Sequence, residues 1–100
     1  IMSEINIGQP ANNLNDNKFL VTVEPVMKTA VEALSALGKT GRLVIIGKGE
    51  SCPNAVATSN ILTQKMLKGN SKIEKITVDS EIDDDGRMIS IIEIVVIKTS

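Results

Sequence analysis

One stretch of the sequence, Gly41–Val56, most constrains how the chain can fold. It contains four successive β-prone apolar residues, Leu43–Ile46, a run typical of a strand buried on both faces. Gly47 and Gly49 then flank Lys48, and glycine allows backbone conformations that other residues avoid. We therefore expect a rigid strand that ends in a tight loop carrying a lysine.

A helix start follows this loop directly. Pro53 suits the first helical turn, where its missing N–H is no loss, and Ser51 or Cys52 falls at or near the cap. Lys48 is then held at the carboxyl end of a strand, a typical place for an anion such as a phosphate. A solvated lysine on a tight turn is the alternative. The pattern lacks the spacing and the Lys-Ser/Thr pair of a P-loop, so we do not expect an NTPase.

The residues before this stretch predict another strand and another helix. The strand is expected at Lys18–Val23, and Pro25 ends it. Apolar residues at the helical period predict a helix over Val26–Leu37, with Gly38 as its stop. A strand, a helix and a strand in this order indicate parallel strands joined by a right-handed crossover. The apolar positions of this helix are Met27, Ala30, Val31, Leu34 and Leu37.

The remaining residues predict a second helix and a hairpin. The helix runs from about Pro53 to Leu67, and the alternating segment Ile73–Val78 is typical of an edge strand. Asp83–Gly86 is a strong turn signal before Met88–Lys98, a long and nearly continuous apolar run typical of a central strand. The order βαβαββ predicts an α/β fold in its α+β, two-layer sandwich form. We expect a mixed sheet with both helices on one face.

The chain is long enough for one domain. Residues 1–17 show little periodicity and are predicted to be a flexible N-terminal segment, and residues 18–100 to form the domain. The last strand is apolar on both faces, whereas a strand in a sheet that is covered on only one side should alternate between apolar and polar residues. Either its neighbours shield it as a central strand, or a second copy of the chain covers it. We expect a dimer, most simply a homodimer.

Composition excludes several classes of function. Phe19 is the only aromatic residue, so base stacking of the kind seen in RRM and OB folds is not expected. The chain has no His, Tyr or Trp, and Cys52 therefore has no histidine to activate it. The three acids Asp83–Asp85 do not match the alternating ligands of a calcium loop. We expect a protein that is not an enzyme and that has no metal or cofactor.

The same features predict where the protein resides. A single cysteine permits no intrachain disulfide and fits a reducing compartment. No apolar run is long enough to cross a membrane, and the first residues lack the charged and apolar regions of a signal peptide. We expect a soluble, cytoplasmic protein without a membrane partner.

Charge is distributed unevenly along the chain. Nine basic and four acidic residues lie between Lys18 and Lys75, whereas five acids and no base lie between Asp79 and Asp85. The predicted body is therefore mildly basic and the predicted hairpin acidic, although the net charge is only −1.

The chain resembles the Alba family of archaeal chromatin proteins, which has eukaryotic relatives in ribonuclease P and MRP. The order and spacing of several short pieces between Phe19 and Lys98 carry the resemblance. These pieces are Pro25-Val26-Met27, Val44-Ile45-Ile46-Gly47-Lys48-Gly49, Ala55-Val56, Asp85-Gly86-Arg87 and Ser90-Ile91-Ile92-Glu93-Ile94.

The resemblance implies a dimer that binds DNA and RNA with little sequence preference, associated with the nucleoid or chromosome. Family members are expected to present a central basic surface and two β-hairpin arms that reach along the minor groove. Lys48 matches a basic loop position of the family, and Arg87 matches the basic residue after the hairpin turn.

Other basic residues are weaker candidates. Lys28 is placed to line the same surface as Lys48, although an ion pair with Glu32, four residues away, explains it equally well. Lys39 and Arg42 flank the opposite end of the strand, and a solvated connection accounts for both. We expect these three residues to contribute less than Lys48 and Arg87.

Three positions depart from the family pattern. Members that bind DNA strongly carry two lysines before the helix-opening proline, where this chain has Val23 and Glu24. They also carry an arginine after the loop glycine, where this chain has Glu50. Each lost phosphate contact lowers both affinity and salt sensitivity. A second hypothesis is therefore a protein-interaction module that forms a heterodimer with a more basic paralogue or joins a ribonucleoprotein.

Overall fold

The computed structural model describes residues 18–99. The predicted flexible segment, residues 1–17, and the last residue of the predicted domain lie outside the described residues. The helices are α2, Val26–Thr40, and α3, Cys52–Ile61, which continues into a π-helical turn, Leu62–Met66. The strands are β2, Lys18–Leu20, β3, Arg42–Lys48, β4, Ser71–Ile82, and β5, Met88–Lys98.

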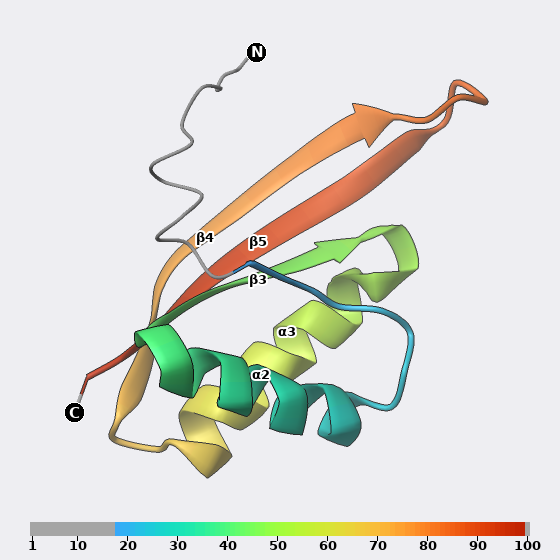
Figure 1. Cartoon of the computed structure of the whole chain (residues 1–100). Coiled ribbons are helices and arrows are strands. Elements are labelled where there is room, and N and C mark those ends of the chain that lie inside the picture. The colour runs from blue at the N-terminus through green and yellow to red at the C-terminus, as the bar shows by residue number, and fades with distance from the viewer. Residues whose placement is uncertain (1–17, 100) are drawn as a thin grey trace.

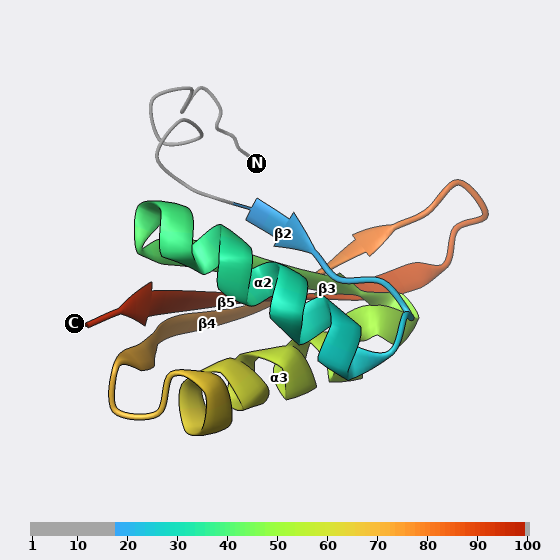
Figure 2. The same cartoon turned by 60° about the horizontal axis from the view of Figure 1, so that its bottom comes forward.

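The element order is the predicted βαβαββ, in two layers (Figure 1). Both helices lie side by side on one face of the sheet, which confirms the α+β sandwich (Figure 2). The strand order is β2-β3-β5-β4, with β2 parallel to β3 and the other pairs antiparallel. The sheet is therefore mixed. β5 is central and β4 lies at the edge, as the apolar and alternating patterns predicted.

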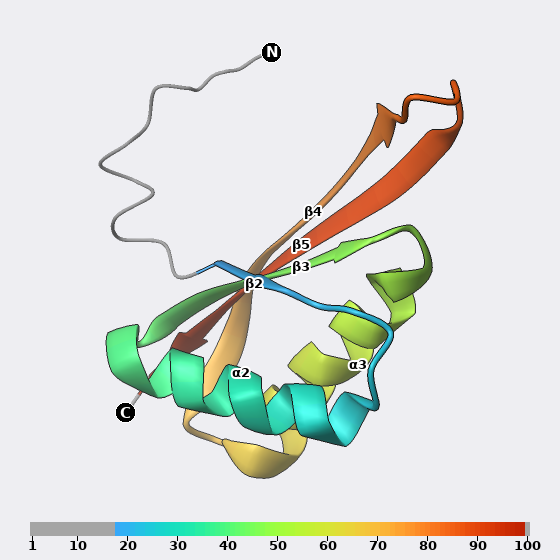
Figure 3. The same ribbon diagram turned by 45° about the vertical axis from the view of Figure 1, so that its right-hand side comes forward.

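The last two strands extend beyond the rest of the sheet as a twisted arm (Figure 3). Its turn joins Ile82 to Met88. Neither helix follows the arm to its tip, so the outer part of β4 and β5 is supported mainly by pairing between the two strands. Within the described residues, no helix combines the length and the apolar character needed to cross a bilayer.

The core lies between the helices and the sheet. β3 contributes Leu43 and Ile45 to it, and β5 contributes Ile94 and Val96. The alternation of these residues shows which face of each strand points toward the helices. Helix α2 adds Ala33 and Leu37 to the same cluster, α3 adds Ala55, and the π-helical turn after α3 adds Leu62.

The end of α2 differs from the prediction. The helix continues past Gly38 to Thr40, and Gly41 is the residue in the left-handed conformation, with φ 79°. The Gly41 N–H donates to the Leu37 carbonyl at 2.8 Å and so closes the helix. Gly38 keeps the helical conformation. The chain turns sharply at Gly41 to enter β3, and glycine adopts the positive φ that this turn needs.

The buried stripe of α2 is also narrower than expected. Ala30, Ala33 and Leu37 are fully buried, but Met27 and Val31 are 58% and 56% exposed. Small side chains on the inner stripe allow close packing of α2 onto the sheet and α3, and the larger apolar residues are left on the outer side of the helix. The predicted apolar period was therefore correct in spacing but included residues from the solvent side.

The register of the hairpin places a row of apolar side chains on the helix-bearing face. Directly opposite residues of paired strands point to the same side of a sheet. Ile94 of β5 belongs to the core and lies opposite Ile76 of β4; the next pair on this face is Ile92 and Val78. Toward the tip, Met88 and Ile82 form another pair. We call Ile76, Val78, Ile82 and Met88, which are 54–73% exposed, the apolar arm face.

Candidate nucleic-acid interface

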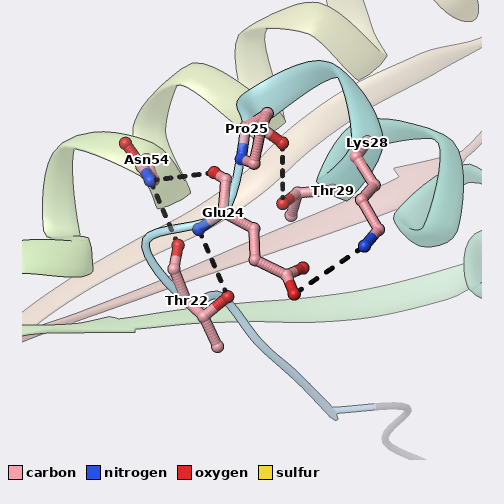
Figure 4. A network of polar contacts seen from close by, with 6 residues as sticks. All are labelled: Thr22, Glu24, Pro25, Lys28, Thr29 and Asn54. Carbon is pink, nitrogen blue, oxygen red and sulfur yellow. Dashed lines mark hydrogen bonds and ion pairs between the residues drawn. The ribbon is translucent and has the colours of Figure 1, made fainter.

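Two loops meet at one end of the molecule. Because β2 and β3 are parallel, the loop from β2 to α2 and the loop from β3 to α3 both leave the carboxyl ends of their strands. Asn54 of α3 joins them: its Nδ2 donates to the Thr22 carbonyl at 3.1 Å and lies 3.4 Å from the Glu24 carbonyl (Figure 4). The two loops therefore form one connected surface.

The first loop is also fixed from the side of α2. The Thr29 hydroxyl and its backbone N–H both donate to the Pro25 carbonyl at 3.2 Å, and Thr29 is buried. Glu24 directs its carboxylate toward Lys28, whose Nζ lies 3.9 Å from Oε2 (Figure 4). The sequence offered an ion pair with Glu32 as an alternative role for Lys28, and in the structure Lys28 pairs with Glu24 instead. Lys28 lies in the first turns of α2, close to the loop that leads into this helix.

Lys48 is the last residue of β3, and its backbone position is set by the glycine before it. A Cβ on Gly47 would come within 2.8 Å of both the Ala55 Cβ and the Ser51 carbonyl oxygen, so only glycine fits here. Gly49 follows with φ 55° and starts the 3₁₀ turn that leads into α3. Lys48 therefore stands at the junction of strand and loop with its side chain 49% exposed.

The Lys48 ammonium is not isolated. Its Nζ lies 3.6 Å from Oε1 of Glu81, a residue of the arm. The register explains the contact, because Lys48 and Asp79 both lie opposite Ile91 of the central strand. Glu81 is two residues beyond Asp79 and so projects from the same face of the sheet. Sequence reasoning missed this pair, which depends on the register of three strands.

Arg42 and Lys39 lie at the other end of β3. The seven residues of this strand separate Arg42 from Lys48 by about 20 Å, at roughly 3.3 Å per residue. The Arg42 Nη1 donates to Oε1 of Glu74 at 2.8 Å, and Lys39 is exposed in the last turn of α2. The fold therefore places these two residues at the opposite end of β3 from Lys48.

Arg87 lies where the turn enters β5. One carboxylate oxygen of Asp83 accepts from the backbone N–H groups of Asp85 and Arg87, both at 2.9 Å. The Asp83 N–H donates in turn to the Arg87 carbonyl, and Gly86 takes φ 82°. The arm thus has an ordered turn that exposes Arg87 beside three carboxylates.

The loop end carries several exposed charged side chains. Over residues 18–99 no group of acids and cysteine could hold a metal ion, and no pocket opens. Glu50 is exposed beside Lys48, and Val23 is exposed beside Glu24. The loop end is therefore a surface of mixed charge.

Comparison with known proteins identifies the fold. The family model for Alba matches residues 17–80, which include both loops and Lys48. The chain belongs to the Alba family. Family membership implies a nucleic-acid-binding, architectural domain in general terms, and Alba is a family of binding proteins rather than enzymes. The match ends before Arg87, so it does not extend to the arm turn.

Two solved structures share the Alba fold. Alba from Thermoplasma volcanium is 24% identical with a TM-score of 0.69, and the match covers 81% of this chain and 99% of that one. ALBA1 from Trypanosoma brucei is 19% identical with a TM-score of 0.66, and 84% and 70% of the two chains are covered. The comparison with curated proteins gave no match.

Proposed function

We propose that the chain is an Alba-type architectural protein that binds the phosphate backbone of DNA, RNA or both as a homodimer, without sequence preference. The observation that carries the proposal is the position of Lys48, on a glycine-flanked junction at the end where both loops meet. Contacts to phosphate fix a protein on nucleic acid but read no sequence. The proposal includes a cytoplasmic location, on the nucleoid or chromosome.

The basic residues have unequal roles in this proposal. Lys48 is the central contact, and Lys28 supports it from the start of α2 at the same end. Arg87, in the turn between β4 and β5, extends the contact along the arm. Lys39 and Arg42 are minor contributors, because they lie at the far end of β3.

The apolar arm face supports the dimer. Val78 is 73% and Ile76 54% exposed, although both belong to the helix-bearing face, whose inner part forms the core. The Ser80–Ser90 pair lies on the same face, between Val78 and Ile82. Exposed apolar side chains that gather on one face are typical of an interaction surface. A second copy of the chain offers the same row, and a two-fold interface would pair the two faces.

This support differs from the one expected on sequence grounds. Val95 on the opposite face of β5 is only 8% exposed between its neighbours β3 and β4, so the central position of the strand accounts for its second apolar face. The exposed apolar surface lies instead on the edge strand and the arm.

A protein-interaction module is the second candidate, and one observation favours it. Lys28, Arg42 and Lys48 each lie within 4.0 Å of a carboxylate of the same chain. Such a surface attracts a polyanion less than a basic one does. A heterodimer with a more basic paralogue, or a ribonucleoprotein subunit, would supply the missing charge while using the apolar arm face for association.

One titration separates the two functions. Labelled duplex DNA and a structured RNA are titrated with the protein at several salt concentrations, together with Lys48→Glu and the matched charge reversal Lys65→Glu, on the exposed π-helical turn after α3. Binding that weakens with salt, and weakens far more in Lys48→Glu, supports the first function. Binding that appears only after a basic paralogue is added supports the second. Equal loss in both variants would contradict the central role of Lys48.

A further inference from the structure

Three of the proposed contact residues, two at the loop end and Arg42 at the far end of β3, each have a carboxylate of the same chain close by. Lys28, Arg42 and Lys48 pair with Glu24, Glu74 and Glu81, respectively. Of the three acids, Glu81 is the one that contacts Lys48, the central residue of the proposed interface, and it does so from the arm.

We propose that Glu81 competes with nucleic-acid phosphates for Lys48 and thereby sets the affinity of this surface. The inference rests on the proposed function, because it concerns the ligand of the same lysine. The carboxylate oxygen, 3.6 Å from Nζ, occupies one side of an ammonium group that a phosphate would otherwise approach. A bound phosphate must either displace Glu81 or bind beside a negative charge, and both weaken the contact.

The position of Glu81 makes this competition persistent. Glu81 lies opposite Ile89 in the ladder with β5, so its backbone is held close to Lys48 even when the side chains separate. The loop also approaches the arm here, since a Cβ on Gly49 would lie 3.7 Å from the Ile89 Cγ2. A carboxylate on a fixed strand therefore returns to Lys48 whenever the phosphate leaves.

The same strand provides a matched control. Asp79 has the same charge, the same strand and the same face, and lies in the row of Lys48 and Ile91. Its Oδ1 accepts a hydrogen bond from the Ser80 backbone N–H at 2.7 Å, whereas the Glu81 carboxylate forms the ion pair with Lys48. Asp79→Asn therefore removes one negative charge from the arm without releasing Lys48.

The test measures the affinity of a labelled DNA duplex for the wild type, Glu81→Gln and Asp79→Asn between low and moderate salt. Each variant is also made in a Lys48→Met background, and thermal unfolding checks that all of them fold. We expect Glu81→Gln to bind about two- to five-fold more tightly than Asp79→Asn, the range of an exposed ion pair. Its salt slope should become steeper by up to about 0.9, the value for one added phosphate contact on B-DNA. Both gains should vanish with Lys48→Met.

The outcomes distinguish a failure of the Glu81 competition from a failure of nucleic-acid binding itself. Equal gains in Glu81→Gln and Asp79→Asn, or a gain that persists with Lys48→Met, would overturn the competition while nucleic-acid binding stands. Binding by Glu81→Gln where the wild type shows none would support it most strongly. No binding by any folded variant at low salt would overturn both the proposed function and the inference.

Discussion

Gly47 lies so close to Ala55 that a Cβ on the glycine would come within 2.8 Å of the alanine Cβ. The Ser51 carbonyl oxygen would be equally near, and a backbone atom cannot rotate away. This close approach sets the distance between the end of β3 and the start of α3. It therefore also sets the position of the loop that begins at Lys48.

Gly47→Ala should destabilise the protein by about 1–3 kcal/mol, the usual cost of overpacking a close contact. Urea unfolding measures the change in the free energy of unfolding. Gly38→Ala is the matched control: no atom lies within 4 Å of the added Cβ, and alanine is favoured within a helix, so this variant should gain about 0.5–1 kcal/mol. Equal stability of Gly47→Ala and the wild type would mean that α3 does not approach β3 as described.

The hydrogen bonds of Asn54 give a second prediction. Asn54→Ala should lower the free energy of unfolding by about 1 kcal/mol, because it removes the side-chain amide that donates to the carbonyls of Thr22 and Glu24 in the loop before α2. Nucleic-acid affinity should fall as well, since that loop loses its connection to α3. Asn60→Ala, at an exposed position of the same helix, should change neither quantity. Similar effects at the two positions would show that the amide does not hold the loop.

The sequence predicted which strand is central and which lies at the edge, because the apolar runs of the two strands differ in kind. The nearly continuous run of β5 indicated a central strand, and the alternation before it indicated an edge; both are confirmed. The predicted end of α2 was wrong because Gly38 and Gly41 are both suitable residues for ending a helix. Only the left-handed conformation needed before β3 decides between them.

The site was less predictable than the fold. The pattern of glycines predicted that Lys48 lies at the end of a strand, as the structure shows. The partner acids could not be found in this way, because Lys48 and Glu81 meet across an intervening strand. The register of β4 also shifts between Ile73 and Lys75, which changes the face of every residue counted across that point.

The turn of the arm gives a third prediction. Asp83→Ala removes the carboxylate that accepts from the backbone N–H groups of Asp85 and Arg87, so amide hydrogen exchange at both residues should accelerate. Asp84→Ala removes the same charge from the exposed turn and should leave those amides protected. Arg87 should contribute less to binding in Asp83→Ala than in Asp84→Ala. Unchanged exchange in Asp83→Ala would show that strand pairing alone orders the turn.

The apolar arm face gives the last prediction. Val78→Glu places a charge in the centre of this face and should dissociate the homodimer, because a buried unpaired carboxylate is strongly unfavourable. Thr77→Glu is the matched control, since the neighbouring residue is also exposed but points to the opposite side of the sheet. Sedimentation velocity over a range of concentrations measures the association. A dimer that survives Val78→Glu but not Thr77→Glu would place the interface on the other face of the sheet, and a monomeric wild type would remove the dimer from the proposed function.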